Sequence, residues 1–318
     1  HHNTAEGATT VANTTLVGVS NSGFMAFGES NRIQTGTVSK GLAVGNTNTG
    51  STANFGTQGA YAIGSNNVIG TSVASNLTFG NQNNNTGTNS QGLILGYKNR
   101  LVDGEGVISI GHSNNSIMGA GSGVIIGHGN TTSGNSDAVL IGSQNYEISG
   151  TAALGTSNTG GLNVIIGKGN KGQQVAVSVG YLNSVSGLRG IGIGSQNISE
   201  SDSNNRGSIA LGYLNSAKGE SIAIGFQNSG AGNSGSIIMG QQNTETNAGN
   251  TGFPGIVLGY ANKAKTTANR TAGTAIAIGT SNNSINGQGG TIILGRANTL
   301  SGKFSTAIGK SNKDVGSA

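Results

Sequence analysis

The 318-residue sequence predicts an all-β fold, a β-solenoid in which short strands stack as successive coils. Three observations lead to this expectation. A short phrase with a glycine and an asparagine at fixed places recurs along the chain, its spacing is close to one solenoid coil, and its apolar triplets are rich in β-branched residues. The chain holds 59 glycines and 1 proline, whereas collagen needs a strict three-residue period and abundant proline. Glycine and asparagine enrichment with a repeat period indicates stacked repeats rather than disorder.

The phrase reads apolar, any, apolar, Gly, any, any, Asn. Its clearest copies are residues 209–215, with Gly212 and Asn215, and residues 222–228, with Gly225 and Asn228. Gly279 with Asn282 belongs to another copy. Twenty glycines are followed by asparagine in this way, at a mean spacing near 15 residues: Gly18, Gly28, Gly45, Gly64, Gly80, Gly96, Gly111, Gly127, Gly142, Gly155, Gly167, Gly180, Gly194, Gly212, Gly225, Gly240, Gly259, Gly279, Gly295 and Gly309.

A second, looser glycine follows many of these asparagines, as Gly187 follows Asn183 and Gly219 follows Asn215. One unit is therefore expected to hold a strand, a corner at Gly-x-x-Asn, a second short strand and another turn. Two strands and two turns make one flattened coil, so the sequence predicts about twenty coils. One coil cannot bury its inner face, and stacking supplies the continuous core.

Each part of the phrase has a physical reason. β-branched and apolar triplets favour strands. Glycine supplies the positive φ of a tight corner. Asparagine tolerates the left-handed region and bonds local backbone, and asparagines of successive coils are expected to form an amide ladder.

The strand triplets are apolar at all three positions in many copies. The positions one and three before the glycine are nearly all large and apolar, and the position between them is apolar or small, as in Ala223 and Ile238. A strand with one wet face should alternate apolar and polar residues. We therefore expect one face to fill the coil and the intervening residues to pack against a partner chain, so that the protein self-associates.

Charge and residue usage narrow the function classes. The net charge is +5, and the basic residues are scattered, whereas nucleic-acid binding calls for a dense basic stripe. There is no cysteine, no apolar run long enough to span a bilayer, and no column of carboxylates suited to glycoside hydrolysis. We expect no enzyme activity, no cofactor, no bound metal, and no contact with nucleic acid or membrane by this chain. Residues 1–13, which begin with His1 and His2, are interpreted as a tag remnant and leader.

Segments such as Asn215-Ser-Ala-Lys-Gly-Glu-Ser-Ile-Ala-Ile-Gly225 resemble the head repeats of YadA-like trimeric autotransporter adhesins. The resemblance covers residues 14–313 and leaves 314–318 as a truncated end before an absent neck and stalk. It implies a left-handed parallel β-roll assembled as a homotrimer, held at the bacterial cell surface by an outer-membrane anchor. It also implies adhesion to host proteins, either matrix proteins such as collagen or receptors of the carcinoembryonic-antigen type. The chain departs from the family in its variable unit length and frequent asparagine.

Binding residues are expected where the repeat varies. The position directly after the repeat glycine holds large aromatic and basic side chains, which adjacent coils would place about 4.8 Å apart. The residues at this position either form a strip that contacts a ligand or mark a corner that tolerates any side chain. Its candidate ligand-binding residues are Tyr97, His112, His128, Tyr181, Tyr213, Phe226, Tyr260 and Arg296.

Long spacers at 199–208, 244–255 and 263–274 form a second candidate set, in which Phe253 and Pro254 stand out. Two other functions stay open at this point. A phage tail-fibre receptor-binding tip is also glycine-rich, β-structured and trimeric, and an ice-binding solenoid would need a regular threonine array, which the sequence lacks.

Overall fold

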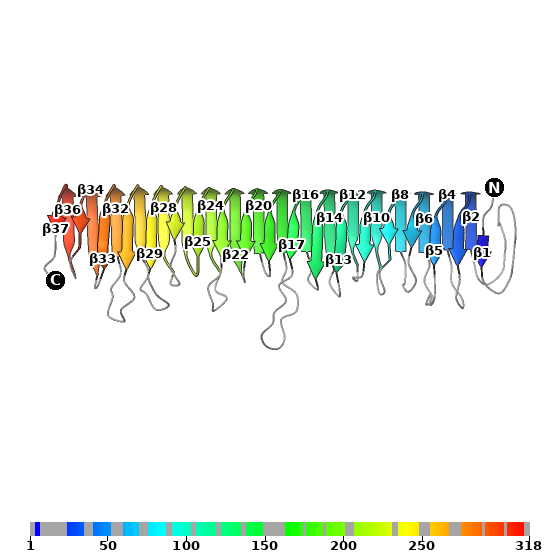
Figure 1. The fold of residues 1–318 in the computed structure, drawn as a ribbon, viewed down its shortest axis with the longest axis horizontal. Coiled ribbons are helices and arrows are strands. Elements are labelled where there is room, and N and C mark those ends of the chain that lie inside the picture. Colours follow the sequence, from blue (N-terminus) through cyan, green and yellow to red (C-terminus); the bar gives the residue numbers. More distant parts are fainter. Residues whose placement is uncertain are drawn as a thin grey trace, which may run out of the picture. The chain divides into compact units, whose positions relative to one another are not determined.

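The computed structural model describes residues 4–6, 24–34, 41–51, 60–69, 76–86, 91–102, 106–118, 122–134, 138–148, 163–173, 176–186, 189–200, 207–230, 235–247, 255–266, 275–287, 290–301 and 304–314. Every regular element in these ranges is a β-strand (Figure 1). The same ranges hold no helix of the length and apolar character needed to cross a membrane. The chain divides into two compact units, His1–Lys168 and Gly169–Ala318, and each is described by itself.

The first unit contains two parallel sheets that alternate along the chain. Its long strands carry the repeat triplet and glycine: β2 (Phe24–Glu29), β4 (Gly41–Asn46), β6 (Ala60–Ser65), β8 (Asn76–Asn81), β10 (Leu93–Tyr97), β12 (Ile108–His112), β14 (Gly123–His128), β16 (Ala138–Ser143) and β18 (Asn163–Lys168). Its short strands follow the repeat asparagine, apart from β1: β1 (Thr4–Glu6), β3 (Arg32–Gln34), β5 (Thr49–Ser51), β7 (Val68–Ile69), β9 (Asn84–Asn85), β11 (Arg100–Val102), β13 (Asn115–Met118), β15 (Thr131–Gly134) and β17 (Tyr146–Ile148).

The second unit repeats this arrangement. Its long strands are β20 (Ala176–Tyr181), β22 (Gly190–Ser195), β24 (Ile209–Tyr213), β26 (Ile222–Phe226), β28 (Ile237–Gln241), β30 (Ile256–Tyr260), β32 (Ala275–Thr280), β34 (Thr291–Arg296) and β36 (Thr306–Lys310). Its short strands are β19 (Lys171–Gln173), β21 (Ser184–Ser186), β23 (Ile198–Glu200), β25 (Ser216–Lys218), β27 (Ser229–Gly230), β29 (Thr244–Asn247), β31 (Lys263–Thr266), β33 (Asn283–Gly287), β35 (Thr299–Leu300) and β37 (Lys313–Asp314).

Each long strand pairs in parallel with the next long strand of its unit, and the repeat glycines lie opposite one another. Gly212 pairs with Gly225, and Gly225 with Gly240. The short strands pair in the same way, as β25 does with β27. This confirms the predicted all-β fold with parallel strands wound as a β-solenoid. The left-handed winding and the three-chain assembly stay predictions.

The count of about twenty coils also stays a prediction, because two copies of the phrase, at Gly18 and Gly155, lie outside the described residues. Strand β16 pairs directly with β18, with Gly142 opposite Gly167.

The corner after each long strand requires glycine for two reasons. Gly225 has a φ of 122°, which favours glycine, and a Cβ there would overlap the carbonyl of Gly240. The left-handed residue of the corner is two places after the glycine, as in Leu214 (φ 56°) and Gln227 (φ 53°). The prediction that the repeat asparagine takes this conformation is therefore wrong, and its presence is explained by hydrogen bonding instead.

The repeat asparagines form the predicted ladder. Asn228 donates its backbone N–H and its Nδ2 to Oδ1 of Asn215, at 3.1 and 3.0 Å. Its Nδ2 also lies 2.9 Å from the carbonyl oxygen of Ile224 and 2.7 Å from that of Gly240. The same pattern recurs in both units, for example between Asn262 and Asn282. Each asparagine therefore satisfies buried backbone groups of its own coil and of the next.

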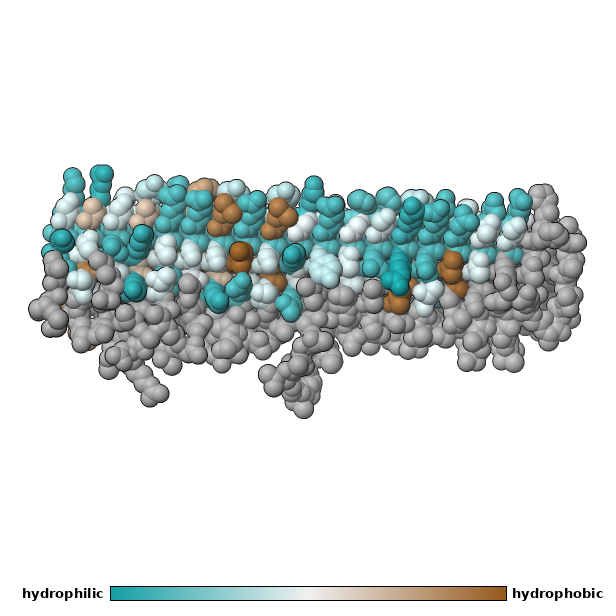
Figure 2. All heavy atoms as spheres, viewed as in Figure 1, coloured by the Kyte–Doolittle hydropathy of each residue, from teal (hydrophilic) through white to brown (hydrophobic). Residues whose placement is uncertain are grey.

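Side chains of the short strands alternate between the coil interior and solvent. In β23, Ser199 is buried and its neighbour Ile198 is exposed. On the face of the molecule drawn in Figure 2, most described side chains are hydrophilic and the hydrophobic ones stand singly. The described residues of that face therefore form no continuous apolar stripe.

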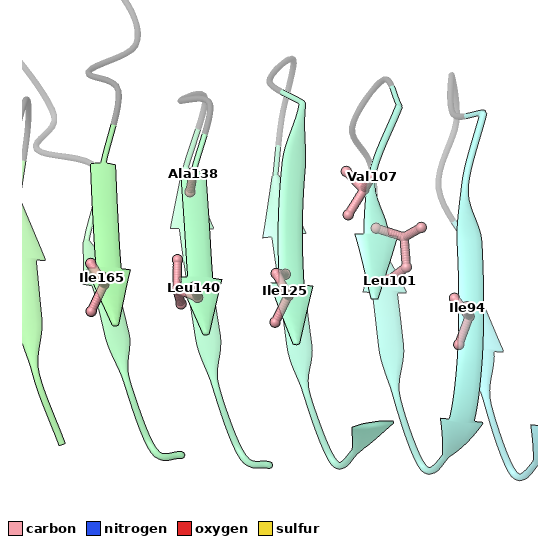
Figure 3. Close-up of a cluster of buried hydrophobic side chains, with 7 residues drawn as sticks. All are labelled: Ile94, Leu101, Val107, Ile125, Ala138, Leu140 and Ile165. Atoms are coloured by element: carbon pink, nitrogen blue, oxygen red, sulfur yellow. The ribbon is translucent and has the colours of Figure 1, made fainter. Parts of the chain in front are cut away.

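The coil interior is filled by the position that we expected to face a partner. Ala223 and Ile238, two residues before the repeat glycine, are fully buried within their own chain. Figure 3 shows Ile94, Ile125, Leu140 and Ile165 at corresponding places on β10, β14, β16 and β18 of the first unit. The predicted assignment of the two faces is therefore wrong. The physical reason is the corner geometry: the positive φ of Gly225 and Gln227 interrupts the two-residue alternation, so that Ala223 before the corner and Asn228 after it both point inward.

The interior is narrow, and bulky and small residues complement one another across it. A Cβ on Gly230 would press on Cδ1 of Ile238, and one on Gly92 would press on Cδ2 of Leu101. Close packing of this kind accounts for the mixture of alanine, serine, glycine and isoleucine at the intervening position.

Candidate functional site

The first candidate surface consists of the residues one and three places before each repeat glycine, here called the outer apolar columns. Because the intervening residue points inward, these two point outward. In the first unit Ile141 and Ile166 are each 37% exposed. In the second unit the columns include large apolar residues that are more than a third exposed: Ile193, Ile237, Met239, Ile292 and Ile308. Contiguous exposed apolar surface of this kind is typical of a protein interface.

The second candidate surface is the position directly after the repeat glycine, here called the post-glycine column. In the first unit it brings three predicted residues together. The rings of Tyr97 and His112 are 5.0 Å apart, and those of His112 and His128 are 4.9 Å apart and stacked. The ammonium group of Lys98 lies 4.9 Å from the centre of the Tyr97 ring. These side chains are exposed, so they form a continuous aromatic row with basic character.

In the second unit the column is interrupted. The Tyr213 and Phe226 rings stack at 5.5 Å with an interplanar angle of 27°. Tyr181 is separated from Tyr213 by Ser195, and Tyr260 is separated from Phe226 by Gln241. The structure therefore places all four predicted aromatic residues of this unit along one edge, but only one pair is in ring contact.

Arg296 continues the same column and is exposed, with Thr280 between it and Tyr260. Phe253 and Pro254, predicted from the long spacers, lie outside the described residues. Parts of all three long spacers lie outside them as well, so these predictions are not tested.

The predicted corner residues lie at the corners, as the repeat predicts. Gly212, Gly225 and Gly279 have φ values of 116°, 122° and 124°. Asn215 and Asn282 are buried members of the ladder. All of these residues build the scaffold, and the buried asparagines are not accessible to a ligand.

The histidine pair does not form a metal site with other ligands in the described structure. No group of three or more histidine, aspartate or glutamate side chains gathers within the described ranges. The stacked imidazole rings of His112 and His128 are thus part of the aromatic row.

Sequence reasoning missed Glu245, a buried carboxyl in the coil interior. It pairs with Gly230 and Ala264 on the neighbouring short strands. Burial raises the pKa of Glu245 to about 7, and a hydrogen bond from the Ser236 side chain works against that rise. The phrase contains a signal for it, because the residue two places after a repeat asparagine points inward, as Ala217 does after Asn215.

Sequence reasoning also missed the residues two places after the repeat glycine. Leu182 and Leu214 are 45% and 37% exposed there, beside the tyrosines of the post-glycine column. Their left-handed backbone turns the side chains outward from the corner.

Comparisons with known proteins provide no relative. No protein-family model, no curated protein and no solved structure matches the chain.

Proposed function

We propose that the chain is the head of a bacterial cell-surface adhesin, a non-catalytic β-solenoid that attaches to host proteins at the host cell surface. The sequence resemblance to YadA-like heads suggests this class. Host receptors of the carcinoembryonic-antigen type and matrix proteins such as collagen are the partners that the resemblance implies.

The observation that supports the proposal best is the pair of outer apolar columns. A stable solenoid needs only its interior columns, yet isoleucine, leucine and valine also recur on the outside of the long strands. Ile237 and Met239 are 38% and 41% exposed in the isolated chain. Exposure of such side chains is unfavourable in water, at about 25 cal/mol per Å². Self-association through this face, as a homotrimer, would remove that cost.

The remaining described features suit a scaffold for recognition. The in-register stack gives a rigid edge on which the post-glycine column is displayed at regular intervals. Tyrosine and arginine are enriched among residues that dominate protein interfaces. The column offers both, in Tyr97, Tyr181, Tyr213, Tyr260 and Arg296.

Two measurements test the proposal. Light scattering should give the mass of three chains of 31.3 kDa each. Labelled protein should bind cultured host cells, and binding should be lost after mild protease treatment of those cells. A monomer that binds no host cell would contradict the proposal. A trimer that instead binds bacterial cells would favour a phage receptor-binding tip.

A further inference from the structure

Three successive long strands of the second unit place a serine between two tyrosines. Tyr181 of β20 pairs with Ser195 of β22, which in turn pairs with Tyr213 of β24. The tyrosines are 44% and 41% exposed. Neighbouring strands lie about 4.8 Å apart, so the two tyrosines stand about 9.6 Å apart along the sheet. We call this arrangement the Ser195 gap.

The ring of Tyr213 is oriented by Phe226. The two rings stack at 5.5 Å with an interplanar angle of 27°, so Phe226 covers one face of Tyr213. The opposite face of Tyr213 is therefore turned along the stack, toward the strand of Ser195. A flat six-membered ring held between two aromatic faces needs about 7 to 8 Å, twice the optimal carbon–carbon separation, and the Ser195 gap provides that width.

Other places in the post-glycine column lack this combination. The imidazole of His112 fills the place between Tyr97 and His128. The long side chain of Gln241 occupies the place between Phe226 and Tyr260. Among the described residues, Ser195 is the short one that has an aromatic neighbour on both sides.

Between the two tyrosines the Ser195 gap presents polar, uncharged groups, and the exposed Leu182 and Leu214 lie beside the tyrosines. Ser195 contributes a hydroxyl group and the next residue, Gln196, contributes an amide. Gln196 has a φ of 55° and is partly exposed. These groups can donate and accept hydrogen bonds. The gap therefore combines two apolar walls with neutral hydrogen-bonding groups.

We propose that the Ser195 gap binds a neutral hexopyranose residue of a host surface glycan. The C–H face of a pyranose ring is apolar and suits an aromatic wall, whereas its hydroxyl groups need the partners that serine and glutamine supply. A charged sugar would meet no countercharge from these four side chains. The inference rests on the proposed adhesive role, which it deepens by naming a ligand class.

The test uses the full chain and a panel of neutral oligosaccharides, first by saturation-transfer NMR and then by calorimetry. Tyr181→Ala and Tyr213→Ala should each weaken the affinity for the sugar that binds by about tenfold, the loss of one aromatic contact. Ser195→Tyr should abolish binding, because a third ring fills the gap. Tyr146→Ala removes a tyrosine of similar exposure from a short strand outside the post-glycine column and should leave the affinity unchanged. Circular dichroism and thermal unfolding establish that each variant is folded.

The outcomes separate this inference from the proposed function. If the protein attaches to host cells but binds none of the sugars at millimolar concentration, the glycan assignment is overturned while the adhesin proposal stands. Equal affinity of the wild type and Ser195→Tyr for the sugar would also overturn it. If Ser195→Tyr abolishes binding to a host protein from which glycans have been removed, the gap accepts a protein side chain and the assignment is wrong. Free polysaccharide and glycoprotein are distinguished by repeating the cell assay after glycosidase treatment.

Discussion

Asn228 donates two hydrogen bonds to the side-chain oxygen of Asn215, one from its backbone N–H at 3.1 Å and one from Nδ2 at 3.0 Å. Both side chains are buried. Asn215 in turn donates Nδ2 to the carbonyl oxygen of Gly225 at 2.6 Å and to Oδ1 of Asn197, in the coil before it, at 3.1 Å. One amide therefore links its coil to the coil before it and the coil after it, which makes the ladder the main polar connection at this corner.

Replacing one ladder residue should be costly. Asn215→Ala leaves the backbone N–H of Asn228 and the carbonyl oxygen of Gly225 without these side-chain partners. Unsatisfied buried groups cost about 1 to 3 kcal/mol each, so we expect a loss of about 3 kcal/mol in the free energy of unfolding, measured in urea. Gln227→Ala, at an exposed corner position, should change it by less than about 0.5 kcal/mol. Equal effects of the two substitutions would contradict the role of the ladder.

Alanine should destabilise the protein far more at one glycine of a corner than at the other. Gly127 has a φ of 122°, and a Cβ there would overlap the Gly142 carbonyl, so Gly127→Ala should prevent stable pairing of β14 with β16. Gly129 has a φ of 63°, and its added Cβ would lie 3.8 Å from the Gln144 side chain. Gly129→Ala should cost only about 1 kcal/mol, the strain of a left-handed non-glycine residue.

Thermal unfolding followed by circular dichroism compares the two variants. Equivalent corners already carry non-glycine residues at the second position, such as Ser113 with a φ of 56°. An unstable Gly129→Ala variant would show that this corner differs from its neighbours.

The repeat predicted most of the fold because its spacing encodes both strands and corners. The regular glycine and asparagine set the register, and the described glycines indeed lie opposite one another. Which face of the long strand points into the coil was harder to predict from apolarity alone, because residues on both faces are apolar. Ala223 and Ile224 look alike in the sequence, yet the first is buried and the second partly exposed. The buried asparagine Asn228 lies five residues after Ala223, and the positive φ of Gly225 and Gln227 interrupts the two-residue alternation at the corner, so counting back from the asparagine selects the wrong face.

The sequence predicted that the candidate site residues share one column, but not which of their side chains are in contact. Counting from the repeat glycine places Tyr181, Ser195 and Tyr213 in one row, since the strands pair in register. The stacking of Tyr213 on Phe226 depends on side-chain rotamers, which the spacing does not determine. The gap at Ser195 therefore became visible only in the structure.

Glu245 should make the second unit more stable in acid than at neutral pH. Its folded pKa is raised to about 7 from 4.5, so the folded state binds this proton more tightly than the unfolded state. The contribution is complete below about pH 4.5 and is lost as the pH rises through 7. A shift of this size corresponds to about 3 kcal/mol. The residues that pair with or face it, Gly230, Ala264, Ser236 and Gly255, do not ionise.

Urea unfolding between pH 4.5 and pH 8 measures this effect. Glu245→Gln keeps the shape of the side chain without its charge, so it should remove the pH dependence and stabilise the protein at pH 8. Glu200→Gln, at a partly exposed surface position, is the matched control and should leave the pH profile as it is. A wild-type profile that is flat over this range would show that the Glu245 carboxyl gains access to water.

The outer apolar columns, and not the intervening residues, should control self-association. The double variant Ile237→Asp with Met239→Asp places charges on residues that are about 40% exposed in the isolated chain, so the coil should fold while the buried charges oppose assembly. Light scattering should then give the mass of one chain of 31.3 kDa instead of three. Ile198→Asp adds a charge at 42% exposure on a short strand and should leave the assembly intact. Ala223→Asp, by contrast, inserts a charge into the coil interior and should unfold the coil. If the double variant is folded and keeps the wild-type mass, the outer apolar columns are not the interface.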